Sequence, residues 1–225
     1  MGRQLAGWLI AKAVTCREEG SMIKTSMRTD GASPQSNQLL SAAAREVANE
    51  EGMIDEALAI DGYSSTSTVA GFTLLPIRSL SGLRDLSIQK KALSQRRDDI
   101  EFHLLKHGKP LVHYYWSGYI MGTLLLYLQE ACHIDFITTD FYDLGFALTL
   151  LRGRSSFILT SGHKEAYLQK LKPATYSESD LRAYYEAFNE KKNEEAGKAM
   201  LDGISLLRTN LFYVNGDSFI VLTLG

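Results

Sequence analysis

Four residues near the middle of the chain have side chains that could form a catalytic site. Cys132, His133 and Asp140 lie around one candidate strand, and His163 follows the next candidate strand. A cysteine thiolate with imidazole and carboxylate partners is a nucleophile arrangement. Open α/β sheets place their ligands at the carboxyl ends of strands. The grouping therefore predicts a hydrolase or a group transferase.

The same residues also have structural interpretations, and these are the stronger ones. Cys132 would end a buried helix, where a free cysteine behaves as a small apolar side chain. His133 would complement the dipole at the C-terminus of that helix, and Asp140 would cap the next helix. Cysteine-nucleophile signatures are specific to families, and the sequence around Cys132 matches none.

Aromatic residues on a later helix suggest a binding surface. Tyr184, Tyr185 and Phe188 fall within one predicted helix and could anchor a protein interface, although they could equally form its core face. The chain lacks G-x-G-x-x-G, a Walker loop, a G-x-S-x-G elbow and paired CxxC motifs. The leading hypothesis is therefore a non-catalytic protein-binding domain, such as an inhibitor, immunity or effector-like protein. The hydrolase or transferase is the alternative.

Three histidines close together raise the question of a metal. His103 and His107 would share a helix face, and His113 follows shortly after. Three imidazoles could hold a metal ion with an open position. The segment reads HLLKH and so lacks the glutamate of HExxH. We therefore predict neither a metal nor another cofactor.

A basic cluster on the same helix suggests a different ligand. Lys90, Lys91, Arg96 and Arg97 form it, and three acidic residues follow within the next four positions. Such a cluster could bind phosphate, but neighbouring blocks of opposite sign more often pair with one another on a solvated surface. No aromatic residues interleave with the cations, and the formal net charge is −2. The chain gives no argument for nucleic-acid binding.

The longest uncharged stretch spans residues 110–129 and could be a core helix or a membrane span. It contains no Asp, Glu, Lys or Arg, and twenty apolar residues suffice to cross a bilayer. Its first half, however, carries His113, Ser117 and three tyrosines, whose polar groups would need partners in hydrocarbon. We therefore predict a central buried helix and no transmembrane span. The two cysteines do not form a disulfide framework, which favours the cytoplasm, with a secreted effector as the other possibility.

The remaining patterns predict an N-terminal helix with a flexible Ser/Thr-rich leader over residues 1–37 and a single α+β domain over residues 38–225. This domain should contain a small sheet of about five strands. Residues 134–138, 141–152 and 156–160 read as a strand, a helix and a strand in a parallel crossover. A long helix should run from Ser177 to about Leu207. Residues 211–224 read as a β-hairpin around Asn215-Gly216.

Overall fold

A five-stranded sheet organises the part of the chain that the computed structural model describes, residues 69–138 and 140–225. All strand pairs are antiparallel, the order is β2-β1-β5-β4, and β3 also pairs with β1. The strands are β1 (Val69–Pro76), β2 (Lys109–Pro110), β3 (Tyr114–Ser117), β4 (Ser155–Leu159) and β5 (Ser218–Leu224). The predicted α+β class with a small sheet of five strands is confirmed.

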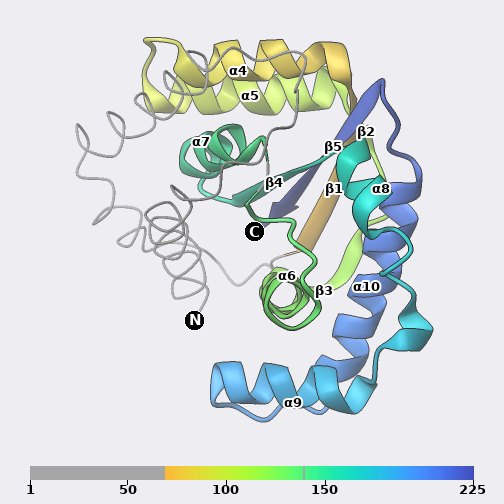
Figure 1. Ribbon diagram of the computed structural model, residues 1–225. Helices are drawn as coiled ribbons and strands as arrows, with labels where there is room; N and C mark the ends of the chain where they lie inside the picture. Colours follow the sequence, from red (N-terminus) through yellow and green to blue (C-terminus); the bar gives the residue numbers. More distant parts are fainter. Residues whose placement is uncertain (1–68, 139) are drawn as a thin grey trace, which may run out of the picture. The chain divides into compact units, whose positions relative to one another are not determined.

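Helices cover both faces of this sheet. Figure 1 shows α4, α5 and α7 on one side, and α6 and α10 on the other. The α-helices of the described residues are α4 (Leu80–Ile88), α5 (Leu93–His107), α6 (Gly118–Cys132), α7 (Tyr142–Arg152), α8 (Ser161–Tyr167), α9 (Glu178–Asn189) and α10 (Ala196–Phe212). Two short 3-10 turns complete the set, η2 (Ile77–Ser79) and η3 (Pro173–Thr175).

The two-sided cover explains the composition of β5. Phe219 and Val221 belong to a core cluster that also contains residues of α4, α5 and α7. Ile220 and Leu222 are equally buried, and they point to the opposite face because side chains alternate along a strand. A strand covered on both faces is a continuous apolar run, which is the pattern that the sequence shows here.

The predicted central buried helix is α6, which is apolar nearly all round. It begins at Gly118, because Ser117 caps it by accepting a hydrogen bond from the Tyr119 N–H, 3.2 Å away. The residues before Ser117 form β2 and β3 rather than helix. Among the helices of residues 69–138 and 140–225, none is both long and apolar enough to cross a membrane.

The predicted parallel crossover is wrong. Residues 134–138 form a turn in which Asp135 Oδ1 accepts hydrogen bonds from the N–H groups of Ile137 and Thr138. The side chain thereby competes with strand pairing for the local backbone. β4 is present but lies antiparallel to β5.

The predicted C-terminal hairpin is also wrong, although its turn is correct. Asn215 accepts hydrogen bonds from Asp217 N and Ser218 N, so the chain does turn there. Leu211 and Phe212, however, are the last residues of α10, and only β5 follows the turn. Burial of Leu211 on the core face of α10 outweighs its suitability for a strand.

The other predicted helices differ mainly in where they break. The helix expected from Ser177 to Leu207 is interrupted after α9, where Glu190 adopts a left-handed conformation with φ 51°. The start at Ser177 is correct, and Ser177 caps α9 because its hydroxyl accepts a hydrogen bond from Asp180 N. The described residues belong to one compact unit. The predicted boundary at residues 37 and 38 lies outside the described residues.

Candidate functional site

Cys132 lies at the C-terminal end of α6, where two tyrosines engage its thiol. Tyr127 and Tyr176 both form side-chain hydrogen bonds with it. Partial burial raises the pKa of the Cys132 thiol above its ordinary value, and the two hydrogen bonds offset part of that rise. A raised pKa reduces the thiolate fraction, which is the reactive form.

His133 and Asp140 are exposed on either side of the Asp135 turn. His133 ends α6 in a left-handed conformation with φ 53°, and its N–H donates to Leu128 O. Asp140 lies close enough to His163 for its charge to raise the pKa of that imidazole. Asp140 does not cap α7, because the residue at the N-cap position is Phe141.

His163 is buried and belongs to the N-terminal cap of α8. Its Nδ1 accepts a hydrogen bond from the backbone N–H of Thr160 at 2.9 Å, which completes a capping box. The ring stacks on Phe136 with 5.8 Å between centroids. Burial lowers the pKa of His163, and the charges of Asp135 and Asp140 offset part of the fall. The nitrogen that could act as a base is therefore already occupied.

The structure thus brings Asp140 and His163 into electrostatic contact but does not pair either with Cys132. The hydrogen-bond partners of the Cys132 thiol are Tyr127 and Tyr176 rather than His163. The contacts of these side chains favour structural roles. Catalysis at this position stays a prediction that no contact here supports.

The aromatic residues of α9 are used largely for packing against α6. Tyr185 is 8% exposed and meets the ring of Tyr119 edge-on, with 6.4 Å between centroids. The Tyr184 hydroxyl donates to Glu130 Oε2 at 2.7 Å. Phe188 is half-buried and stacks on Tyr184. Tyr185 is therefore on the core face of α9, while Tyr184 and Phe188 keep a partly open side.

Large apolar side chains are exposed on α5, on the β2–β3 segment that forms one edge of the sheet, and at the end of α10. We call them the edge surface. Its members are Phe102, Leu105, Val112, Tyr115, Phe212 and Tyr213. Tyr115 is 89% exposed, although Tyr114 beside it is buried and donates its hydroxyl to Ala199 O at 2.6 Å. The alternation of side chains along a strand explains this difference. The sequence does not reveal β3, because this short strand lies within the uncharged stretch of residues 110–129.

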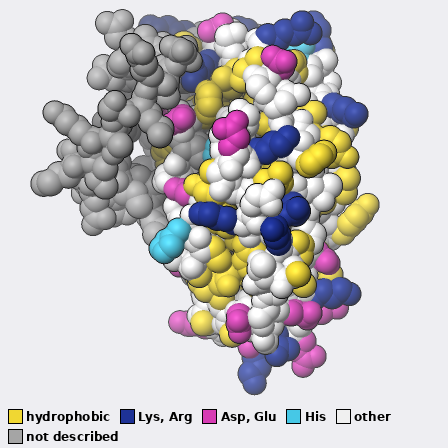
Figure 2. Space-filling view, turned by 45° about the vertical axis from the view of Figure 1, so that its right-hand side comes forward, with side chains coloured by type: hydrophobic (Ala, Val, Ile, Leu, Met, Phe, Trp, Pro, Cys, Tyr) yellow, Lys and Arg dark blue, Asp and Glu magenta, His cyan; other side chains and the backbone are white. Residues whose placement is uncertain are grey.

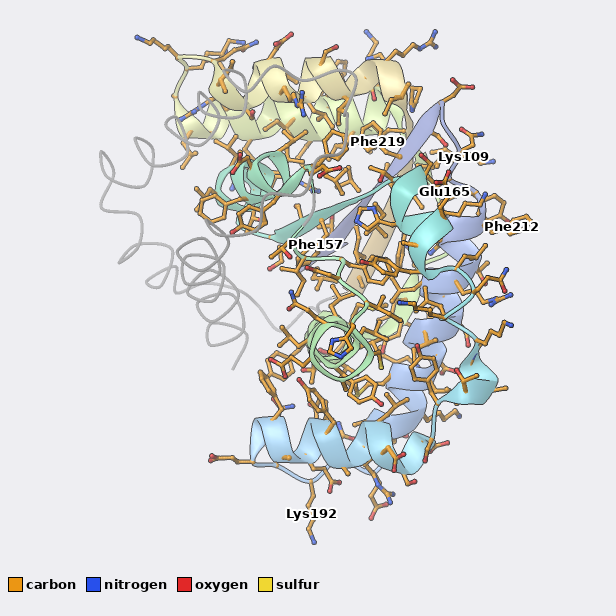
Figure 3. The ribbon with its side chains drawn as sticks, viewed as in Figure 1. Lys109, Phe157, Glu165, Lys192, Phe212 and Phe219 are labelled. Carbon is orange, nitrogen blue, oxygen red and sulfur yellow. The ribbon has the colours of Figure 1, made fainter. Side chains whose placement is uncertain are left out.

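The parts of the edge surface come from three segments that the fold holds together. Phe102 and Leu105 lie on α5, which runs almost directly into β2. Val112 lies between β2 and β3, and its carbonyl accepts from Asn210 Nδ2 near the end of α10. Figure 3 shows Phe212 projecting outward from that end of α10, whereas Phe157 and Phe219 lie among the packed layers.

Lysine side chains accompany the exposed aromatic rings. Lys106 Nζ lies 5.8 Å from the ring centroid of Phe102, and Lys164 Nζ lies 5.1 Å from that of Phe212. Lys164 also donates to the carbonyls of Phe212 and Val214, each at 2.7 Å, and so fixes the end of α10. Figure 2 shows a face on which hydrophobic side chains lie among lysine and arginine side chains.

A metal centre finds no support in the described residues. The rings of His103 and His107 are neighbours, with centroids 4.6 Å apart, and His103 Nε2 lies 3.2 Å from Ser79 O. Across residues 69–138 and 140–225, no three His, Cys, Asp or Glu side chains are grouped so that they could hold an ion.

Comparison with protein-family models, with curated proteins and with solved structures finds no significant match for this chain.

Proposed function

We propose that the chain is a non-catalytic protein-binding domain and that its partner docks on the edge surface. The observation that carries the proposal is the exposure of large apolar side chains there, with Tyr115 at 89% and Phe212 at 68%. Exposed aromatic residues that project from a rigid framework are typical anchors of protein interfaces.

The partner docks through side chains rather than by adding a strand to the sheet. The edge offers only two residues in β2, one of which is Pro110, and the register of β3 against β1 shifts at Ala70. Proline, lysine and irregular pairing are the means by which proteins protect sheet edges from strand addition. The backbone of Lys109–Pro110 is therefore a poor template for an incoming strand.

The charges around the edge surface define the partner further. Lys106 lies on α5 and Lys109 on β2, and Lys164 of α8 lies over the ring of Phe212. Complementary charge at the rim steers association and selects the partner. We therefore propose a protein partner that presents apolar side chains bordered by carboxylates.

A pull-down with three baits tests the proposal. The baits are the full wild-type chain, a Tyr115→Ala/Phe212→Ala variant and a Tyr184→Ala variant, and the prey is extract from the native source. We expect a stoichiometric partner with the wild type and with Tyr184→Ala, and at least a tenfold loss with the edge variant, because truncating one interface anchor typically costs about 2 kcal/mol or more.

Thermal unfolding of each bait shows that it is folded. If the folded edge variant keeps the partner and Tyr184→Ala loses it, the interface lies on α9 instead of the edge surface. The absence of a partner from all baits would contradict the proposed function.

A further inference from the structure

One lysine holds both the backbone and the ring of an exposed residue of the edge surface. Lys164 Nζ donates to the carbonyls of Phe212 and Val214, each at 2.7 Å, and lies 5.1 Å from the ring centroid of Phe212. An ammonium group has three N–H donors, so it can bond two carbonyls and still face a ring within cation–π distance. The two kinds of contact together fix Phe212, because one holds its backbone and the other its side chain.

The end of α10 depends on this lysine because its own last turn supplies no cation. The last carbonyl groups of a helix lack partners within the helix and carry partial negative charge. Phe212 is the final residue of α10, and the last turn of the helix contains no basic residue. Lys164 comes from α8, 48 residues earlier in the chain. The ring of Phe212 is 68% exposed, so little of it packs against the domain, and the lysine contact is important for its orientation.

The helix that carries Lys164 is anchored to the sheet. α8 begins two residues after β4, which pairs with β5 along its length. Thr160 and His163 form a reciprocal capping box at the start of α8, directly before Lys164. Figure 3 shows α8, which carries Glu165, beside the end of α10 that carries Phe212. Lys164 therefore links the exposed ring to the core of the domain.

Two other lysine–ring pairs are local by comparison. Lys106 and Phe102 lie four residues apart on α5, with 5.8 Å between Nζ and the ring centroid. Lys170 lies 5.6 Å from the ring centroid of Tyr167, three residues earlier. Pairs of this kind cover a ring without connecting distant segments. Lys164 connects α8 to the end of α10, so it can set the position of an exposed ring relative to the rest of the domain.

A second tie between the same two segments provides a matched control. Arg208 Nη1, on α10, donates to the carbonyl of Leu168 at 3.0 Å, directly after α8. Arg208 and Lys164 are both half-buried, and each donates from a charged group to a backbone carbonyl of the other segment. The lysine contacts Phe212 itself, whereas the arginine bonds a carbonyl at the end of α8. Comparing the two separates the positioning of Phe212 from the general attachment of α8 to α10.

We propose that Lys164 is a positioning residue for the partner site, and that its charge holds Phe212 in the orientation that the partner recognises. The inference rests on the proposed function and deepens it, because it names the residue that prepares an anchor of the edge surface. Without the charge, the end of α10 loosens and the ring samples several rotamers. Ordering that ring again on binding then costs affinity.

A fluorine probe on Phe212 tests the positioning without any partner. Para-fluorophenylalanine replaces Phe212 alone in the full chain, and its fluorine NMR signal is recorded with wild-type Lys164 and in Lys164→Met, Lys164→Arg and Arg208→Met. Lys164→Met should move the signal toward its position in the urea-unfolded chain. Lys164→Arg should keep the signal near the wild-type position, because a guanidinium retains both the charge and the donors. Arg208→Met should also leave it in place.

Thermal unfolding establishes which variants fold. An unchanged fluorine signal in folded Lys164→Met would overturn the proposal. Equal changes in Lys164→Met and Arg208→Met would also overturn it, because both residues would then act only by attaching α8 to α10. Lys164→Gln is the second neutral variant, and if neither neutral variant folds, Lys164 is required for the fold itself and the proposal is rejected.

Partner binding separates this inference from the proposed function. The partner that wild type retains from extract of the native source is eluted and titrated against each unlabelled variant. Lys164→Met should bind it roughly threefold to tenfold more weakly, which is the cost of ordering one side chain, whereas Lys164→Arg and Arg208→Met should bind as wild type does. Equal binding by folded Lys164→Met would overturn the inference and leave the proposed function standing. No partner for any variant would contradict the proposed function, and the fluorine signal would still decide whether Lys164 positions Phe212.

Discussion

The α6–α9 layer and the edge surface use aromatic residues in opposite ways. On α9, Tyr185 is buried against Tyr119, and the Tyr184 hydroxyl is bonded to Glu130. At the edge, Tyr115 and Phe212 extend into solvent with most of their surface accessible. Aromatic content by itself therefore does not locate an interface. The neighbours that the fold provides decide whether a ring stabilises the domain or remains free for a partner.

The largest difference between the two regions should appear in stability, when Tyr185 and Tyr115 are each truncated to alanine. Tyr185→Ala removes a buried ring, so we expect a loss of roughly 3–5 kcal/mol in the free energy of unfolding. Tyr115→Ala should change stability by no more than about 0.5 kcal/mol, because it is a surface substitution. Urea denaturation of both variants measures the difference. A stability loss of similar size in both would mean that Tyr115 also packs against the domain.

Two adjacent tyrosines of β3 provide a finer test. Tyr114→Phe removes the hydroxyl that donates to Ala199 O, and we expect a loss of about 1 kcal/mol. Tyr115→Phe is the matched control, with the same chemical change at an exposed position and no expected loss. An unchanged unfolding midpoint for Tyr114→Phe would show that the hydrogen bond to α10 does not contribute.

Tyr176, which is hydrogen-bonded to the Cys132 thiol at the end of α6, should make the stability of the domain fall at alkaline pH. Burial, followed by the nearby Cys132 and Tyr127, raises the pKa of Tyr176 from 10.0 to about 12. A raised pKa in the folded state means that its stabilising contribution is complete below pH 10.0 and is lost as the pH rises to about 12. Tyr176→Phe should therefore lose less stability than wild type over this interval. Urea midpoints measured along the pH range check this, and parallel curves for the two proteins would contradict it.

Much of the fold was predictable from local patterns. The buried helix α6, the start of a helix at Ser177 and the turn at Asn215 all follow from composition and spacing. One error comes from a local side-chain hydrogen bond that strand propensity does not reveal, and the other comes from long-range packing. Residues 134–138 have strand-forming side chains, but Asp135 takes the N–H groups of the next residues. Leu211 is suited to a strand, but α10 needs it for the core.

The candidate sites were less predictable than the fold. His163 was singled out for chemistry, yet its Nδ1 serves as a helix cap. Tyr185 was singled out for binding and is buried. The edge surface was missed because β3 is only four residues long and lies inside an apolar stretch that resembles a single helix. The charges of the basic cluster do not by themselves indicate that Arg96 is buried.

The sequence by itself determined the α+β class, the central apolar helix and several caps and turns, because these depend on contacts within a few residues. Only the tertiary structure decided which tyrosines face solvent and which acceptors surround Arg152. Arg96 and Arg152 have the same chemistry, and they differ because Glu101, Ser156 and Thr223 converge on Arg152. That convergence joins a helix, the start of β4 and the end of β5. Such an arrangement depends on the packing of distant segments, and local sequence patterns do not record it.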